Sequence, residues 1–150
     1  MGAILQKLAA RLGLGQLPDT LRAQLESEGR ILYLAEGIWE TAIFRHFRAP
    51  SARSSYRRIS FIGYFALSQR RLVAKAKCRH RVDVNVAYDD PRFHQMTFAV
   101  RPKYLSLAMD ASTQSPQMSG QMEVRLHLPD VATAAKILEQ AGARMEWNGR

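Results

Sequence analysis

The side chains best suited to binding chemistry are eleven basic residues that lie between Thr41 and Val82 with no Asp or Glu among them. They are Arg45, Arg48, Arg53, Arg57, Arg58, Arg70, Arg71, Lys75, Lys77, Arg79 and Arg81. The chain has 22 basic and 13 acidic residues, so this stretch carries +11, the remainder carries −2, and the formal net charge is +9. A field of one sign attracts anions over a Debye length of about 8–10 Å in ordinary salt. The charge distribution therefore predicts an anionic partner.

Five of these arginines cluster around one polar loop and are the candidate anion-binding residues. We call them the loop arginines: Arg45, Arg48, Arg53, Arg57 and Arg58, which surround the loop at 49–55. Phe47 and Tyr56 lie beside them, and core packing is a commoner role for such aromatic residues than stacking on a ligand. The competing interpretation is a solvated strand face whose long charged side chains protect an exposed sheet edge.

No set of residues with the spacing of a catalytic or metal site accompanies these arginines. His94 with Asp89 and Asp90 comes nearest to a metal cluster, but the sequence Asp-Asp-Pro-Arg at 89–92 is typical of a turn. Cys78 falls on the apolar side of its predicted strand, so we expect a small buried side chain. We therefore predict no catalytic residues, no metal site and no cofactor, and we do not expect an enzyme.

The single cysteine excludes an internal disulfide and every metal motif that needs several cysteines. No apolar run reaches the roughly 18–20 residues that a membrane span needs. We therefore expect a cytoplasmic protein that associates with a membrane, if at all, at its surface. An apolar stripe in a predicted helix at 3–12 favours packing on the domain or on a second copy over membrane binding. Nucleic acid is a weaker candidate partner, because the helix-turn-helix, zinc-finger and RNA-recognition signatures are absent.

The hydrophobic pattern predicts helices at 3–12 and 18–28 and a change to period two from Ile31 onward. Further strands are expected at 38–48, 57–68, 72–78, 82–88, 94–101, 103–110 and 121–128, and a helix at 131–141. We divide the chain into a helical extension at 1–29, a barrel with its C-terminal helix at 30–142 and a tail at 143–150.

Two hairpins are specific enough for a predicted register. In the first, Leu67 opposes Leu72 and Phe65 opposes Ala74, which brings apolar side chains to one face. In the second, the turn Arg79-His80-Arg81 sets Ala76 against Val84.

Seven meandering strands followed by an amphipathic helix are the plan of the pleckstrin-homology superfold. The segment Gly29-Arg30-Ile31-Leu32-Tyr33-Leu34-Ala35-Glu36-Gly37 resembles the opening strand of bacterial PH-like and GRAM-like domains. Their second hairpin is similar to Ala66-Leu67-Ser68-Gln69-Arg70-Arg71-Leu72-Val73. The resemblance covers about 30–142 and implies a mainly β, seven-stranded antiparallel barrel with a C-terminal capping helix. A lipocalin-like or other small barrel is the competing architecture.

The resemblance also implies a binding module, since members of this superfold bind phosphoinositides, other anionic lipids or peptides. Phosphoinositide-binding members carry a basic-x-Arg pair on the second strand, whereas here Arg57 and Arg58 are adjacent and point to opposite faces of a regular strand. We therefore expect a noncatalytic binding or scaffolding module that meets an anionic membrane surface or an acidic protein through the loop arginines. The alternatives are a protein-interaction or self-assembly domain, which includes a homo-oligomer, and a nonspecific nucleic-acid binder.

Overall fold

The computed structural model describes residues 4, 7–8, 13–50, 52–75 and 84–147. The described part is mainly β. Its elements are α2 (Asp19–Glu28), β1 (Ile31–Ala49), β2 (Ala52–Ser68), β3 (Arg71–Ala74), β4 (Val84–Ala87), α3 (Pro91–Gln95), β5 (Thr97–Val100), β6 (Leu105–Asp110), the short 3-10 helix η1 (Ala111–Thr113), β7 (Ser119–Leu126), α4 (Val131–Gln140) and β8 (Arg144–Trp147).

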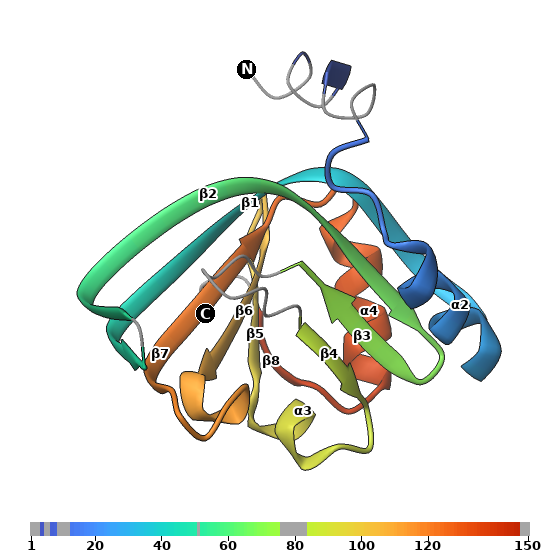
Figure 1. Ribbon diagram of the computed structural model, residues 1–150. Coiled ribbons are helices and arrows are strands. Elements are labelled where there is room, and N and C mark those ends of the chain that lie inside the picture. Colours follow the sequence, from blue (N-terminus) through green and yellow to red (C-terminus); the bar gives the residue numbers. More distant parts are fainter. Residues whose placement is uncertain (1–3, 5–6, 9–12, 51, 76–83, 148–150) are drawn as a thin grey trace.

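The strands form one curled sheet in the order β4-β3-β2-β1-β7-β6-β5-β8 (Figure 1). All neighbours are antiparallel except β5 and β8, which run parallel. The curled sheet is a half-barrel, with β4 and β8 at its two ends. The expected mainly β fold is confirmed, but the described part has eight strands in an open, mixed sheet instead of seven in an antiparallel barrel. The segment 143–150, expected as a tail, supplies the parallel edge strand β8.

The predicted hairpin registers have different outcomes. The pairs Phe65–Ala74 and Leu67–Leu72 between β2 and β3 are confirmed. Between β3 and β4, Ala74 opposes Val84, so the prediction that Ala76 opposes Val84 is wrong by two residues. A shift of two keeps every side chain on its face, so alternation alone does not distinguish these registers. The predicted turn at 79–81 and Cys78 lie outside the described residues, as does most of the expected helix at 3–12.

Besides a register shift between Ile31 and Tyr33 at its start, two irregularities bend the long strand β1, which joins segments that the sequence suggested as separate strands. The register between β1 and β2 shifts at Gly37, whose φ of 64° suits a residue without a side chain. The register between β1 and β7 shifts between Arg45 and Arg48, and His46 lies there with φ of 52°. Bulges of this kind bend a strand and increase its twist, and both of these lie in the strand that joins the two halves of the sheet.

The main core fills the concave face of the sheet and contacts α4, which follows β7 as predicted. Phe65, Phe93, Phe98 and Leu138 are fully buried in it. Asp130 caps α4 by accepting a hydrogen bond from the backbone N–H of Thr133 at 3.1 Å. The apolar side of α4 can therefore close the interior without leaving the first turn of the helix unsatisfied.

A second, smaller core lies on the opposite face of the sheet, beneath α2. Leu25 of α2 is fully buried there against Tyr64, Ala66 and Val73. These strand residues alternate with Phe65 and others of the main core, so β2 is covered on both faces at this end. Among the described residues, no helix is long and apolar enough to cross a membrane.

Candidate functional site

The loop arginines lie at one end of the β1–β2 hairpin, the longest strand pair in the sheet (Figure 1). Arg48 pairs directly with Arg53, and Arg45 pairs with Tyr56. Arg57 opposes Phe44, while Arg58 opposes Ile43. The hairpin therefore places all five near its end, yet it divides them between two faces. Arg57 and Arg58, adjacent on regularly paired β2, point to opposite sides of the sheet as the alternation predicted.

Arg45 differs from the other four because it already has a carboxylate partner. Its guanidinium lies 3.2 Å from Oε1 of Glu123 on β7 and 5.9 Å from the centre of the Tyr56 ring. Glu123 also accepts hydrogen bonds from Arg125 and from Ser106, both at 2.9 Å. Burial raises the pKa of Glu123, but the hydrogen bonds from Arg125, Ser106 and Arg45 and the charge of Arg125 lower it further than burial raises it. Arg45 thus helps to hold the outer face of the sheet together.

The other four loop arginines are exposed, and no carboxylate in the described part of the chain pairs with them. Their side chains form no ion pair within the described part of the chain: Arg48, Arg53, Arg57 and Arg58. Beside them, Tyr56 leaves 56% of its surface exposed, whereas Phe47 is buried and packs edge-on against Phe44 with ring centres 5.0 Å apart. The two aromatic residues therefore differ in role, because only Tyr56 is available to a partner at this surface.

The other residues that suggested chemistry in the sequence have structural roles where they are described. Asp90 caps α3 by accepting from the N–H of Arg92 at 2.9 Å, and it forms an ion pair with the side chain of Arg92 at 2.8 Å. His94 lies on the exposed side of α3. Within residues 13–50, 52–75 and 84–147, His, Cys, Asp and Glu form no group of three that could hold a metal ion.

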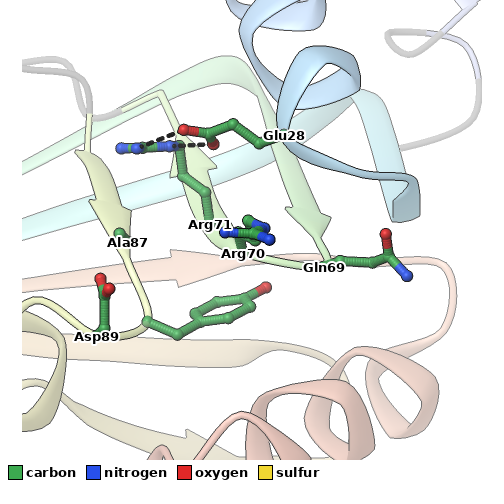
Figure 2. Close-up of a pocket in the computed structure, with 7 residues that line it drawn as sticks. Glu28, Gln69, Arg70, Arg71, Ala87 and Asp89 are labelled. Atoms are coloured by element: carbon green, nitrogen blue, oxygen red, sulfur yellow. Dashed lines mark hydrogen bonds and ion pairs between the residues drawn. The ribbon is translucent and has the colours of Figure 1, made fainter.

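A second polar site, which was not predicted from the sequence, lies at the other end of β1 and β2. It is a hollow of about 310 Å³ between the end of α2, the β2–β3 turn and the end of β4 (Figure 2). It is lined by Glu28, Gln69, Arg70, Arg71, Ala87, Tyr88 and Asp89. In the sequence, Arg70 and Arg71 belong to the basic stretch and to a predicted hairpin. Glu28 and Asp89 come from distant segments, so no local signal indicates that these four side chains meet.

The β2–β3 turn beside this hollow is fixed by hydrogen bonds. Oγ of Ser68 accepts from the backbone N–H groups of Arg70 and Arg71, at 3.2 and 3.0 Å. The hydroxyl of Tyr88 donates to the carbonyl of Ser68 at 2.7 Å, and burial raises the pKa of that hydroxyl. The neutral, hydrogen-bonded tyrosine therefore ties the end of β4 to the turn.

Comparisons with protein-family models, curated proteins and solved structures found no match.

Proposed function

We propose that the protein is a noncatalytic, PH-like binding module whose loop arginines bind a surface of anionic lipid headgroups. The observation that carries this proposal is the group of four exposed arginines at the end of the β1–β2 hairpin, none of which has a carboxylate partner in the described chain. The PH-like assignment is supported by the pairing of β1 with β7, which joins two antiparallel meanders, β1 to β4 and β5 to β7, into one sheet, and by α4 directly after β7.

The division of the arginines between two faces favours a broad anionic surface over a single compact ligand. Arg57 and Arg58 point in opposite directions, so one headgroup held on one face does not contact both. A hairpin that approaches a charged surface with its end can instead bring side chains from both faces close to that surface. The exposed ring of Tyr56 is suited to the interface, where aromatic side chains with a polar group are favoured.

The binding energy expected from this geometry is modest and depends on salt. Each Lys or Arg near an anionic membrane contributes about 1 kcal/mol, so the loss of all four contacts lowers the partition coefficient about 1,000-fold. The attraction decays over a Debye length, so added salt should weaken it strongly. Such a module binds reversibly at the surface and needs no membrane-crossing segment.

Vesicle sedimentation tests this proposal with two variants of equal net charge. The first replaces Arg48, Arg53, Arg57 and Arg58 with Gln. The control replaces four exposed basic residues away from the hairpin end, Arg30, Lys103, Lys136 and Arg144, with Gln. We expect the natural protein and the control to bind phosphatidylserine-containing vesicles in preference to phosphatidylcholine vesicles, and the first variant to lose this preference.

Three outcomes would contradict the proposal. These are equal binding of the natural protein to both kinds of vesicle, an equal loss in the two variants, and binding to poly-glutamate or duplex DNA without binding to anionic vesicles. The last result would indicate an acidic protein or a nucleic acid as the partner. A salt-resistant oligomer formed without any vesicle binding would favour the self-assembly alternative.

A further inference from the structure

The hollow at the β2–β3 turn is far from the loop arginines and has a different character. Strands rise about 3.3 Å per residue, so the 19 residues of β1 place its two ends roughly 60 Å apart along the strand. The four unpaired loop arginines form a surface of one sign, whereas two cationic and two anionic side chains line the hollow: Arg70, Arg71, Glu28 and Asp89. This second site therefore needs a separate explanation.

One pair of opposite charges in the hollow is satisfied within the protein. Nε and Nη2 of Arg71 donate to the two carboxylate oxygens of Glu28 at 2.9 and 3.0 Å (Figure 2). Nη1 of Arg71 donates to Asn85 at 2.9 Å, and Asn85 in turn donates to Gln24 of α2 at 3.2 Å. The hydrogen bond between Arg71 and Glu28 raises the pKa of the first and lowers the pKa of the second. These groups form a rigid, internally neutral wall.

The other two charged residues, Arg70 and Asp89, do not form an ion pair with each other, and backbone hydrogen bonds fix the turn that carries Arg70. The N–H of Arg70 donates to Ser68, and the carbonyl of Arg70 accepts from the N–H of Tyr88 at 2.9 Å. Both charged side chains are exposed, and neither forms an ion pair with another described residue. Figure 2 shows the Arg70 side chain at the turn and the Asp89 side chain at the end of the neighbouring strand, apart from each other.

This arrangement selects a ligand that carries both charges. A simple anion attracted by Arg70 would also meet the carboxylates of Glu28 and Asp89, and a simple cation would meet two guanidinium groups. A zwitterion can place its carboxylate on Arg70 and its ammonium on Asp89, and each contact then gains a charge-assisted hydrogen bond. Gln69 also lines the hollow, and its side-chain oxygen accepts from the N–H of Arg30 at 2.9 Å.

We propose that the hollow binds a small zwitterion of amino-acid or dipeptide size between Arg70 and Asp89. Its volume lies at the lower end of the range of about 300–1,000 Å³ that is usual for ligand pockets. The wall formed by Arg71, Glu28 and the Ser68 turn is in place before a ligand arrives, which reduces the entropic cost of binding. Because the site is open and polar, we expect a dissociation constant of about 1 mM.

Titration of the full chain by amide NMR tests the proposal, with alanyl-alanine as the probe. We expect saturable shifts at the amides of 69–71 and 87–89. N-acetylalanine, which lacks the ammonium, and alanine amide, which lacks the carboxylate, should each bind at least about fivefold more weakly. Arg70→Gln and Asp89→Asn should each lower the affinity for alanyl-alanine by a similar factor. The matched controls Lys136→Gln and Glu139→Gln, two exposed substitutions on α4, should leave the affinity unchanged.

Absence of saturable shifts at these amides up to about 50 mM alanyl-alanine would overturn the proposal, since it implies affinity far below the expected range. It would also be overturned if inorganic phosphate produced the same shifts and Asp89→Asn left its affinity unchanged or tightened it, because the hollow would then be an anion site. The spectra report directly whether each variant is folded. The outcome is independent of vesicle binding, because the fourfold arginine variant leaves all lining residues of the hollow intact.

Discussion

The buried carboxylate of Glu40 lies where a side chain on Gly63 would have to fit. Glu40 is fully buried on β1 and shares the concave face with Ala42 and Phe44 of the main core. A methyl group placed on Gly63 of β2 would overlap Oε2 of Glu40. It would also lie 2.7 Å from Cδ of Glu40 and 3.2 Å from Cβ of Lys75. We therefore predict that Gly63→Ala destabilises the fold because it forces this carboxylate to move.

Two opposing effects set the magnitude. Overpacking a well-packed interior costs about 1–3 kcal/mol, whereas replacing Gly by Ala inside a strand recovers about 0.5–1 kcal/mol. The expected net loss in the free energy of unfolding is about 1–2 kcal/mol. Urea unfolding measures it as a lower midpoint at an unchanged m-value.

A double-mutant cycle separates the steric effect of the Glu40 side chain from the chemistry of its carboxyl group. In an Glu40→Ala background the overlap is gone, so Gly63→Ala should cost less than about 0.5 kcal/mol. In a Glu40→Gln background the side chain keeps its size while its carboxyl group becomes an amide, so the cost of Gly63→Ala should persist. The reasoning is refuted if Gly63→Ala is neutral in the natural chain, or if its cost is the same in the Ala background as in the natural one.

Two further predictions concern the β1–β7 pair. Gly120, at φ of 102°, has no room for a side chain: a methyl group there would overlap the carbonyl oxygen of His46 and lie 2.8 Å from that of Arg45. Gly120→Ala should therefore lower the free energy of unfolding by about 2 kcal/mol or more. Gly13 is also left-handed but has no atom within 4 Å of an added methyl group, so Gly13→Ala should cost less. Equal losses of the two variants in urea unfolding would contradict this prediction. Burial acts to raise the pKa of Glu123, but its hydrogen bonds with Arg125, Ser106 and Arg45 and the charge of Arg125 lower this pKa overall from 4.5. The ionised form of Glu123 therefore stabilises the fold above pH 4.5, and this contribution is lost as the pH falls through the lowered pKa. Glu123→Gln should therefore reduce stability at pH 7 and make stability fall less steeply below pH 4.5. Urea midpoints measured from pH 3 to 7 test this prediction. If the midpoints of the variant fall as steeply at acid pH as those of the natural protein, Glu123 does not have this role.

Alternating side chains carried the sequence-based prediction of the sheet. The period of two identified the main strands and set Phe65 against Ala74, because one wrong step would have turned every apolar side chain outward. The same reasoning predicted that Ala76 opposes Val84, whereas Ala74 does. A shift of two residues leaves every side chain on the same face, so the alternation of side chains does not reveal it. The strand β8 was missed because Arg144–Trp147 is only four residues long and pairs in parallel with β5, a distant partner.

The arginines at 45–58 could be identified from the sequence because their distinguishing property is local. Basic residues that are close together in the sequence remain close together in space in almost any arrangement of strands. Its distribution over two faces also followed from the adjacency of Arg57 and Arg58. The pairing of Arg45 with Glu123 could not be predicted, because those residues are 78 positions apart and meet only through the β1–β7 ladder.

The hollow at the β2–β3 turn could not be found from charge, because its lining is neutral. Its two arginines lie within the same basic stretch as the loop arginines, and the formal charge of +9 treats all of them alike. The difference between the sites arises when α2 brings Glu28 to Arg71 and the end of β4 brings Asp89 to the turn. The run of basic residues in the sequence thus predicts where an extended anion would bind, whereas the proposed zwitterion site depends on contacts between segments distant in sequence. Vesicle binding and dipeptide binding should accordingly respond to different substitutions, although both sets lie within one basic stretch and its immediate neighbours.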